Sequence, residues 1–496
     1  MTATMRGVPM SLSFDPDSLT LPIGHFIGGR LLPADGIIAM QRPSDGKAYA
    51  DCPVADADLV DRAVQTAKSA LKTSGWASVR PRERLNVLHR WAGLIEAEAV
   101  KLAQLEALSS TRPVSQIVAG DIPVTAEQIR FFAEFADKEG SDLVPTDGDN
   151  LGMIVTEPYG VVGAITPWNF PINMAGWKLG PALAAGNAVV LKPSEMTPFS
   201  TLFLAELAVR AGLPAGLINI VLGDGAVTGT ALTGHPDIAK VSFTGSTRAG
   251  SAIMENIART GVKPMTLELG GKSPQIVFAD ADLDRAAAAI ATSVLANAGQ
   301  ACVAGTRLIR HEPAAAAILT AIGELGGAAA GGPHWDERAQ YSPIISDRQR
   351  QRIHSIVSAT VAAGGDCLIG GGPMDGPGYF YQPTLIGGVD MAAPAVREEI
   401  FGPVLTVQTS RDEEEALSLA DHPTYGLAAG LFTRDLSRAI RLTRRIQAGT
   451  IWVNRYGRSR DHILPTGGYK QSGIGKDLGR EAYLANRKSK SVLIGL

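Results

Sequence analysis

The sequence predicts an α/β protein built on parallel β-sheets that are covered by helices on both faces. From about residue 150 onward, short apolar runs alternate with segments of helical periodicity, and the stretches that follow the runs are rich in Gly, Pro, Asn and Ser. The four clearest runs are Val161–Ile165, Ala188–Leu191, Ile218–Val221 and Val241–Phe243. Apolar strands with intervening helices are typical of βαβ units. Ligands of such sheets bind beyond the carboxyl ends of the strands, where these polar residues lie.

The two ends of the chain follow other patterns. The first 130 residues are predicted to be mostly helical, because apolar residues recur at helical spacing from Val60 to Leu71 and from Leu88 to Ile95. A second α/β stretch is predicted after Glu268 and continues to about residue 460. Within it, the Ala- and Gly-rich segment Ala314–Gly332 fits a surface helix with a loop better than a flexible linker. Ser491–Ile494 predicts a short strand whose partner edge could belong to another subunit.

Composition argues against several classes of function. A chain of 496 residues is too long for one core, so two or three domains are expected. A net charge of −3 predicts no basic surface for nucleic acid. The N-terminus shows no apolar signal segment. Ala286–Gly305 is interrupted by polar residues and predicts a buried helix running into a loop, so no membrane span is expected. The three cysteines are far apart, which favours a metal-free cytoplasmic protein without disulfides.

Cys302 stands among small residues, in the segment Asn297-Ala-Gly-Gln-Ala-Cys-Val-Ala-Gly305. Small neighbours leave a sulfur accessible, and a thiolate there could add to an electrophilic carbon. A lone intracellular cysteine is more often a small buried hydrophobe, and taken alone this segment favours that interpretation. Cys52 and Cys367 lack such surroundings, so both are interpreted as structural.

Glu268 lies at the end of an apolar run, just before a Gly-Gly turn. Partial burial would raise the pKa of this carboxyl toward the range that suits a general base. A carboxylate that pairs with Lys272 or caps a helix is the alternative, and this segment alone does not decide.

Asn169 lies in Ile165-Thr-Pro-Trp-Asn-Phe-Pro171, where an apolar strand is stopped by two prolines. Rigid flanks fix the direction of the side-chain amide, as a donor to an oxyanion requires. An Asn that satisfies the backbone of a turn is the commoner alternative.

Two segments indicate a nucleotide site. Ser242-Phe-Thr-Gly-Ser-Thr-Arg-Ala-Gly250 runs from a predicted strand into a helix through small residues, as at phosphate sites, although it is not GxGxxG and is weak support alone. Lys192-Pro-Ser-Glu195 follows another strand, and its Lys and carboxylate could hold ribose hydroxyls. The carboxylate would repel a 2′-phosphate, which favours NAD over NADP. A surface ion pair is the alternative.

Together these segments resemble the aldehyde dehydrogenase superfamily, in its order and spacing over nearly the whole chain. The most specific pieces are Glu268-Leu-Gly-Gly-Lys272, Gly299-Gln-Ala-Cys302 and Glu399-Ile-Phe-Gly-Pro403, followed by Pro167-Trp-Asn169. A chance match to all four in order is very improbable, so the resemblance favours the catalytic interpretation of each segment.

The resemblance implies a Rossmann-like cofactor domain, an α/β catalytic domain and a small β element for oligomerisation. The implied boundaries are 1–135 and 153–267 for the NAD-binding domain and 268–462 for the catalytic domain. Residues 136–152 and 463–496 would form the bridging segments and the C-terminal return. A homodimer or homotetramer is implied as well.

The implied reaction is oxidation of an aldehyde to its acid with NAD, through a thiohemiacetal and then a thioester on Cys302. Glu268 would be the general base, and Asn169 with the Cys302 N–H would form the oxyanion hole. Lys178 matches a lysine linked to proton transfer. The positions that match cofactor contacts are Ile165, Thr166, Pro167, Trp168, Lys192, Ser194, Glu195, Gly225, Phe243, Thr244, Gly245, Ser246, Leu269, Glu399 and Phe401.

The chain departs from the family at the predicted substrate pocket. Thr466 stands where many members have an aromatic residue, and the loop before it is unusually basic. This predicts a polar, carboxylate-bearing aldehyde that pairs with Arg458 or Arg460. Solvated arginines, or arginines at a subunit contact, fit the loop equally well. Phe170 and Trp177 are the other predicted pocket residues.

Two other functions are considered. A dehydrogenase that passes the thioester to coenzyme A typically lacks the glutamate base, so Glu268 argues against it. A catalytically idle structural or binding protein of the same fold would not need Cys302, Glu268 and Asn169 together.

Overall fold

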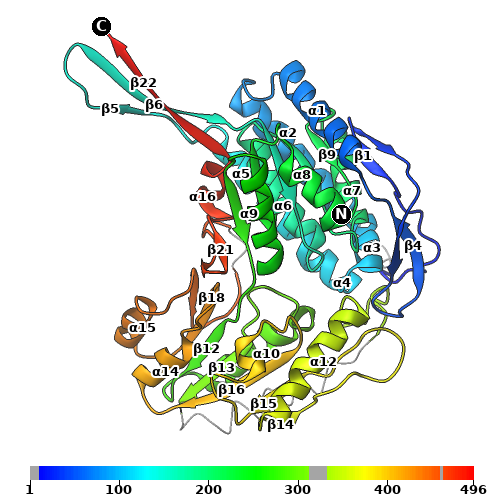
Figure 1. The fold of residues 1–496 in the computed structure, drawn as a ribbon, viewed down its shortest axis with the longest axis vertical. Coiled ribbons are helices and arrows are strands. Elements are labelled where there is room, and N and C mark those ends of the chain that lie inside the picture. The colour runs from blue at the N-terminus through cyan, green and yellow to red at the C-terminus, as the bar shows by residue number, and fades with distance from the viewer. Residues whose placement is uncertain (1–10, 312–331, 459–461) are drawn as a thin grey trace, which may run out of the picture.

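The structure is a computed structural model that describes residues 11–311, 332–458 and 462–496. Within these ranges the strands form two large sheets and three small ones (Figure 1). No helix in the described ranges combines the length and the apolar character that crossing a bilayer requires. The buried apolar side chains of the described residues form four core clusters, to which both the strands of these sheets and the helices packed against them contribute.

The first sheet has eight described strands in the order β2-β1-β9-β8-β7-β10-β11-β21, and the five from β9 to β11 are parallel. This confirms the predicted parallel sheet, in which the four apolar runs are neighbours. Strand order reverses between β7 and β10, so their carboxyl ends open the crevice where such sheets bind ligands. The strands are β1 (His25–Ile27), β2 (Arg30–Leu32), β7 (Val161–Ile165), β8 (Ala188–Lys192), β9 (Ile218–Ile220), β10 (Lys240–Thr244), β11 (Met265–Glu268) and β21 (Gly473–Ile474).

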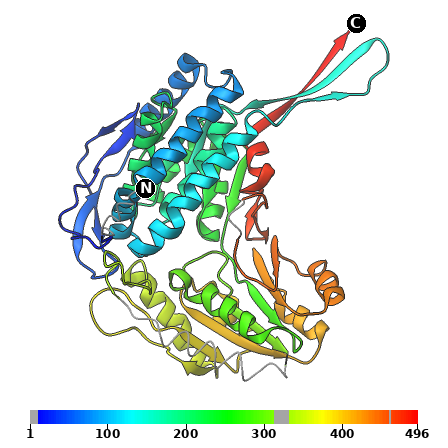
Figure 2. The same cartoon turned by 180° about the vertical axis from the view of Figure 1, so that it is seen from behind.

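Helices pack around this sheet, and those of the N-terminal third lie across it in Figure 2, drawn in blue to cyan. Helix α1 shows why these segments are helical. Asp56 caps its N-terminus by accepting from Leu59 N, buried residues recur along one face, and Gly75 ends it at φ 64°. The helices are α1 (Ala57–Ser74), α2 (Pro81–Ala97), α3 (Ala99–Ser109), α4 (Val114–Gln116), α5 (Ile122–Phe135), α6 (Pro171–Ala184), α7 (Phe199–Arg210), α8 (Thr230–Gly234) and α9 (Thr247–Thr260).

The prediction that the first 130 residues are mostly helical is wrong for residues 25–52. That segment forms β1, β2, β3 (Ile38–Gln41) and β4 (Ala48–Cys52), and helices begin only at α1. Its first hairpin closes with Ile27 opposite Arg30, around Gly28 and Gly29 at φ 64° and 83°. Two-residue hairpin turns favour glycine because both central residues need positive φ.

The second sheet has seven described strands in the order β14-β15-β16-β13-β12-β18-β19, of which only β14 is antiparallel to its neighbour. It confirms the predicted second α/β stretch. A helix, α10, does run into a turn at Ala286–Gly305 as predicted, but only one of its faces is buried, and Ala288 and Thr292 on the other face are exposed. Nearly all of Ala314–Gly332 lies outside the described residues. The elements are β12 (Pro274–Val277), α10 (Leu283–Leu295), β13 (Arg307–His311), α12 (Asp347–Ala362), β14 (Asp366–Ile369), β15 (Thr384–Gly387), α13 (Pro394–Arg397), β16 (Val404–Ser410), α14 (Glu413–Ala420), β18 (Ala428–Phe432), α15 (Leu436–Thr443) and β19 (Thr450–Val453).

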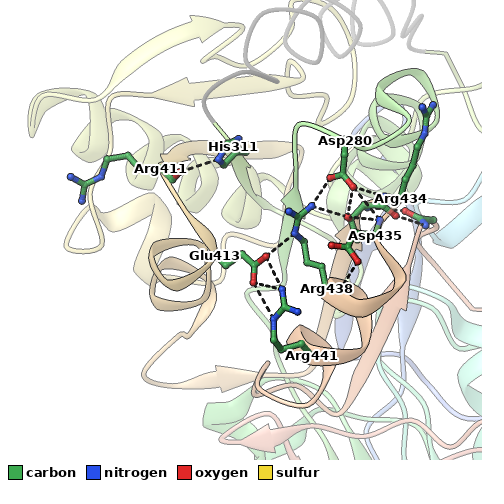
Figure 3. Close-up of polar contacts among 10 residues, drawn as sticks. Asp280, His311, Arg411, Glu413, Arg434, Asp435, Arg438 and Arg441 are labelled. Atoms are coloured by element: carbon green, nitrogen blue, oxygen red, sulfur yellow. Dashed lines mark hydrogen bonds and ion pairs between the residues drawn. The ribbon is translucent and has the colours of Figure 1, made fainter.

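Strand order in the second sheet reverses between β12 and β18, and this crevice is filled by the chain's own charges (Figure 3). The Asp280 carboxylate accepts from the main-chain N–H groups of Arg434 (2.9 Å) and Asp435 (3.1 Å). Arg438 donates to Asp280 over 2.7 Å and to Glu413 over 2.8 Å. Because the Asp280 carboxylate already accepts from these N–H groups, they are not available to a ligand. The crevice of the first sheet is therefore the better candidate for a binding site.

A third sheet reaches away from the body of the molecule (Figure 1) and consists of β5 (Asp142–Val144), β6 (Asn150–Pro158) and β22 (Arg487–Gly495). The predicted C-terminal strand is therefore longer than expected, and it pairs along its whole length with β6 of its own chain. The remaining elements are β17 (Tyr425–Gly426), β20 (Tyr469–Lys470) and α16 (Gly479–Leu484). The domain boundaries implied by the resemblance stay a prediction.

Candidate active site

Buried hydrogen bonds join the Asn169 loop to the loop that carries Cys302. The Asn169 amide Nδ2 donates to the Gln300 carbonyl oxygen over 3.0 Å, two residues before the cysteine. Asn297 donates in turn to the Asn169 carbonyl oxygen over 3.0 Å, and its own Oδ1 accepts from the Thr111 hydroxyl at 2.6 Å. The amide proposed to bind an oxyanion and the proposed nucleophile therefore occupy one hydrogen-bonded unit.

The backbone before Cys302 adopts a left-handed conformation. Asn297, Ala298 and Gly299 have φ of 51°, 49° and 70°, and each non-glycine residue in this region costs roughly 1–2 kcal/mol. A Cβ on Gly299 would lie 2.1 Å from the Gly402 carbonyl oxygen, so only glycine fits there. Gln300 holds the loop in place by donating to the Asn297 and Pro343 carbonyl oxygens, each over 2.9 Å. Strain held in this way is common at functional loops.

Cys302 is partly buried, and the charges around it act in opposite directions. Burial raises the pKa of its thiol above the ordinary value, Arg458 lowers the pKa, and the carboxyls of Glu268 and Glu399 raise it. The thiol is therefore protonated at neutral pH and needs a proton acceptor before it can act as a nucleophile.

Glu268 lies at the end of β11 with 4% of its surface exposed, and its main-chain oxygen accepts from Gly245 N over 3.0 Å. Burial and, next, the Asp477 carboxylate raise the pKa of Glu268 to about 8, against the opposing effect of nearby cations. Its Oε1 has no hydrogen-bond partner among the described residues. A buried carboxyl with a free oxygen and a pKa near neutrality has the properties of a general base.

Lys178 forms a buried ion pair with Asp477, a residue that the sequence had not singled out. Asp477 follows β21, and its backbone exchanges two hydrogen bonds with Thr466, of 2.7 and 2.9 Å. Lys178 lowers the pKa of Glu268 while Asp477 raises it, so this pair and the candidate base are electrostatically connected. The available signal was an acidic residue four positions after the Gly-rich segment that ends at Gly473.

Several of the predicted cofactor residues lie at the carboxyl ends of the neighbouring strands β8, β7 and β10. The hydroxyls of Thr166 and Thr244, at the ends of β7 and β10, are buried and lack partners among the described residues. Ser246 caps α9, and its Oγ accepts from Ala249 N over 3.2 Å. Lys192 Nζ lies 3.6 Å from Glu195 Oε2, at the end of the neighbouring β8. Unpaired hydroxyls beside a helix N-terminus fit the phosphates and sugars of a dinucleotide.

Glu399, one of the predicted cofactor residues, lies close to the loop that carries Cys302. Glu399 Oε1 accepts from Gly271 N over 2.9 Å, and a Cβ on Gly271 would lie 2.6 Å from the Cys302 carbonyl oxygen. The rings of Trp168 and Phe401 meet edge to face at 5.3 Å.

The other predicted cofactor residues have varied surroundings, and their contact with a cofactor stays a prediction. Phe243 and Leu269 are buried, and Ser194 Oγ accepts from Met196 N over 3.3 Å. Ile165 ends β7 and Pro167 follows it. Gly225 begins a π-helical turn, and Gly245 lies between β10 and α9.

Three of the predicted substrate-pocket residues lie together. The Arg458 guanidinium donates to the Thr466 hydroxyl over 2.6 Å and lies 4.8 Å from the centre of the Trp177 ring. The charge of Arg458 also lowers the pKa of both Cys302 and Glu268, so this cation lies near both groups. Phe170 packs instead against Arg112, at 4.9 Å. Arg460 lies outside the described residues.

Several supporting residues were not predicted. Asn297 and Gln300 belong to the segment 297–305 that carries Cys302. Two amide side chains among small residues could have indicated their supporting role. Thr111 and Tyr456 gave no such signal. The Tyr456 hydroxyl donates to the Val303 carbonyl oxygen over 2.6 Å and supports the loop from its other side.

Residues 33–492 match the sequence profile of the aldehyde dehydrogenase family. The chain belongs to this family. It is 42% identical over 438 residues, 88% of each chain, to the NADP/NAD-dependent aldehyde dehydrogenase PuuC of Escherichia coli. It is 39% identical over 454 residues to the mitochondrial aldehyde dehydrogenase of Sus scrofa, covering 91% of this chain and 87% of that one. The predicted family and reaction class, oxidation of aldehydes to acids, are therefore confirmed.

Solved structures agree with this aldehyde dehydrogenase over nearly its full length. The indole-3-acetaldehyde dehydrogenase AldA of P. syringae, in complex with NAD+ and IAA, has a TM-score of 0.94 at 38% identity, covering 97% of this chain and 98% of that one. The gamma-glutamyl-gamma-aminobutyraldehyde dehydrogenase of Burkholderia cenocepacia has a TM-score of 0.93 at 39% identity, with the same coverage. These proteins differ in the aldehyde they are named for, so the likeness does not identify the substrate of this chain.

Proposed function

We propose that this aldehyde dehydrogenase oxidises its substrate through covalent attachment to Cys302, with Glu268 as the base and Asn169 as an oxyanion donor. The observation that carries the proposal is the shared unit in which the Asn169 amide bonds the Gln300 carbonyl oxygen, two residues before Cys302. An amide has two N–H donors, so the second remains for the substrate oxygen. The Glu268 carboxylate raises the pKa of the Cys302 thiol, so the two groups interact electrostatically.

The proposed reaction begins when Glu268 removes the thiol proton and the Cys302 thiolate adds to the aldehyde carbon. The Asn169 amide and the Cys302 N–H donate to the oxyanion of the adduct, and each such donor is typically worth about 100- to 1,000-fold in rate. When bound, NAD supplies the acceptor for the hydride that leaves this adduct. Glu268 releases the thiol proton to solvent and is again a carboxylate, so it can take a proton from the water that attacks the thioester, which releases the acid and restores the Cys302 thiolate.

Trapping the thioester tests this proposal. Glu268→Gln with an aldehyde and NAD at alkaline pH, where hydroxide can remove the thiol proton in place of Glu268, is expected to form one equivalent of NADH slowly and to accumulate an acyl group on Cys302, seen by mass spectrometry. Wild-type enzyme turns over without accumulating it. An acyl group on another residue, or none in a variant that still reduces NAD, contradicts the proposal.

We propose NAD as the cofactor, with Lys192 and Glu195 near the adenosine ribose. Glu195 is partly exposed beside the buried Lys192, where its carboxylate would disfavour a 2′-phosphate. NAD+ in the AldA structure supports this choice, while PuuC is named for both cofactors. Binding of NAD and NADP to the free enzyme, followed by tryptophan fluorescence, is expected to favour NAD. Glu195→Gln is expected to reduce the preference.

We also propose that the substrate is an aldehyde with a carboxylate, which pairs with Arg458. Support comes from the half-buried Arg458 guanidinium, whose charge lowers the pKa of both Cys302 and Glu268. Among the described residues, its only hydrogen-bond acceptor is a neutral group, the Thr466 hydroxyl. A guanidinium held against an indole ring and a hydroxyl is oriented to receive a planar anion.

The ratio of kcat/KM for 4-oxobutanoate and for butanal, which have equal carbon counts, tests the substrate class. A charge-assisted contact predicts a preference for the carboxylate of roughly 10- to 100-fold. Arg458→Gln is expected to remove it, whereas Arg455→Gln, at an exposed position three residues earlier, is expected to retain it. Equal values in the wild-type enzyme contradict the proposal.

We propose a homodimer or homotetramer in a reducing compartment such as the cytoplasm. The three free thiols suit that compartment. The β5-β6-β22 sheet supports assembly, because its two edge strands expose apolar side chains, Leu493 of β22 (67%) and Leu143 of β5 (72%). Such edges and apolar surfaces are usually covered in proteins. Light scattering is expected to give twice or four times the chain mass, and less after residues 487–496 are removed.

A further inference from the structure

The helix that follows Asn169 has no capping side chain of its own. Helix α6 begins at Pro171, two residues after Asn169, and its N-cap residue Phe170 makes no side-chain hydrogen bond to it. The first N–H groups of a helix have no partner within the helix, and a side-chain oxygen of the N-cap residue usually accepts from one of them. Proline has no N–H, so the first one in α6 belongs to Ile172. Because Ile172 is fully buried, its N–H needs a partner from elsewhere in the fold.

Glu106 of α3 is that partner. Its Oε2 accepts from the Ile172 N–H over 3.0 Å, across 66 positions of the sequence. None of the Glu106 surface is exposed, and its neighbours in α3, Leu105 and Ala107, are buried apolar residues. Burying a carboxyl group is unfavourable unless the group makes a hydrogen bond. The contact with the start of α6 therefore explains why a carboxyl lies at this position in the core.

The chain between Ile172 and Asn169 has little freedom. The ring of Pro171 fixes its φ, and the residue before a proline, here Phe170, is restricted as well. The Phe170 ring is also held from outside, because the Arg112 guanidinium lies 4.9 Å from its centre. A shift of Ile172 would therefore move Asn169 rather than be absorbed by the two residues between them.

The same end of α3 also holds the loop that carries Cys302. Thr111, five residues after Glu106, donates through its hydroxyl to Asn297 Oδ1 over 2.6 Å. Asn297 lies in the left-handed turn before Cys302. One short stretch of chain, residues 106–112, is thus in contact with both loops of the candidate site.

We propose that Glu106 is a positioning residue that caps α6 and thereby sets the position of the Asn169 amide relative to Cys302. It acts through Asn169, so the inference rests on the proposed role of Asn169 as an oxyanion donor. Without this cap the first turn of α6 would loosen, and a donor that is poorly placed stabilises the oxyanion less.

Oxidation of butanal at saturating NAD tests this. Glu106→Met keeps the length of the side chain and fills the same space, but it offers no oxygen to the Ile172 N–H. Its kcat/KM is expected to fall about 10- to 100-fold, less than when the Asn169 amide itself is removed. Rates are expressed per folded chain, which is counted by NAD binding through tryptophan fluorescence.

Glu106→Gln is the conservative variant. Burial and, next, the Asp121 carboxylate raise the pKa of Glu106 to about 8, so this carboxyl is mostly protonated at pH 7. A protonated carboxyl accepts through its carbonyl oxygen, and the amide of glutamine offers the same oxygen in the same place. Glu106→Gln is therefore expected to recover most of the rate that Glu106→Met loses.

A double-mutant cycle separates positioning from a general loss of structure. If Glu106 acts through the Asn169 amide, Glu106→Met is expected to cost little further rate in a chain that already carries Asn169→Ala. A substitution that only loosens the fold would lower the rate by the same factor in both backgrounds.

Arg84 provides a matched control at the opposite end of the same helix. This buried guanidinium of α2 donates to the carbonyl oxygen of Ala184, the last residue of α6, over 3.2 Å. Arg84→Met removes a buried polar contact to α6, as Glu106→Met does, but at the end far from Asn169. It is expected to lower the Tm and to leave kcat/KM unchanged.

An undiminished rate in Glu106→Met, or an equal loss in both Asn169 backgrounds, overturns the inference. If Glu106→Met does not fold, Glu106→Asp replaces it in the cycle. Its carboxyl is one methylene short of Ile172, and it is expected to show the same non-additive loss.

Asn169→Ala alone separates this failure from that of the proposed function. If Asn169→Ala lowers the rate and Glu106→Met does not, only the role of Glu106 is wrong. If Asn169→Ala leaves the rate unchanged, the proposed oxyanion donor is wrong, and the role of Glu106 is wrong with it.

Discussion

The side-chain amide of Asn297 donates to the main-chain carbonyl oxygen of Asn169 over 3.0 Å, and it also bonds the Gln300 carbonyl oxygen at 3.2 Å. One side chain therefore fixes the spacing between the loop of the proposed oxyanion donor and the loop of the proposed nucleophile. Asn also tolerates the φ of 51° that this position requires better than most residues do.

Replacing Asn297 is expected to impair catalysis more than folding. Asn297→Ala removes the hydrogen bonds to both loops, so the Asn169 amide is held less firmly toward the substrate oxygen. The expected loss in kcat is about 10- to 100-fold, less than when an oxyanion donor is removed outright. Asn219→Ala is the matched control, because Asn219 is fully buried and also bonds backbone groups, but far along the sheet in β9. Steady-state kinetics with thermal unfolding separates the two effects. A larger kcat loss in Asn219→Ala would contradict this assignment.

Cys302→Ala is expected to abolish acid formation, with a loss of at least about 1,000-fold, because no other group can form the covalent intermediate. Cys367→Ala is the control, since that thiol is exposed and lies in β14 at the far edge of the second sheet. NADH formation and acid release are both measured. Full-speed acid formation by Cys302→Ala would rule out the covalent route.

The pH dependence of the wild-type enzyme is expected to follow Glu268. Its pKa of about 8 means that the base form is scarce at pH 6 and predominates at pH 9. The rate of thioester hydrolysis should therefore rise with pH across this window and level off above it. Glu268→Gln should remove the rise and lower the hydrolysis rate about 100- to 10,000-fold, the usual contribution of a general base. Single-turnover measurements check this, and a rise that persists in the variant would assign the pKa to another group.

The sequence predicted the sheets well and the supporting contacts poorly, for physical reasons. Strands such as Val161–Ile165 are apolar on both faces, and that pattern survives in the sequence because both faces are buried. The hairpin at His25–Leu32 has strands of three residues, too short for any periodicity, and only Gly28-Gly29 indicated the turn.

In the candidate site, too, the residues in local motifs were predicted and their supporting contacts were not. Cys302, Glu268 and Asn169 could be named because each stands in a distinctive local motif. Asp477 could not, because it gains its role from Lys178, which lies 299 positions away in the sequence. Thr111 likewise acts only through a partner 186 positions away, Asn297. Such pairs become visible only once the fold brings them together.

Stability is expected to fall in mild acid because of a buried histidine. His334 is fully buried, its Nδ1 lies 3.0 Å from the Ser110 carbonyl oxygen, and burial lowers its pKa to about 3. The folded protein therefore keeps His334 neutral, whereas the unfolded chain takes up a proton below about pH 6.5. The contribution of this histidine to stability is present above pH 6.5 and is lost as the pH falls toward 3.

For one such group, this loss amounts to about 2 kcal/mol at pH 5, and burial lowers the pKa of His25 and His422 in the same direction, to about 4 each. His334→Gln removes the titrating group, so the free energy of unfolding should depend less steeply on pH between 6.5 and 5, whatever its value at pH 7. Exposed His354→Gln should leave the slope unchanged. Urea unfolding at a series of pH values measures both slopes, and equal slopes for His334→Gln and wild type would show that this imidazole is not kept neutral by the fold.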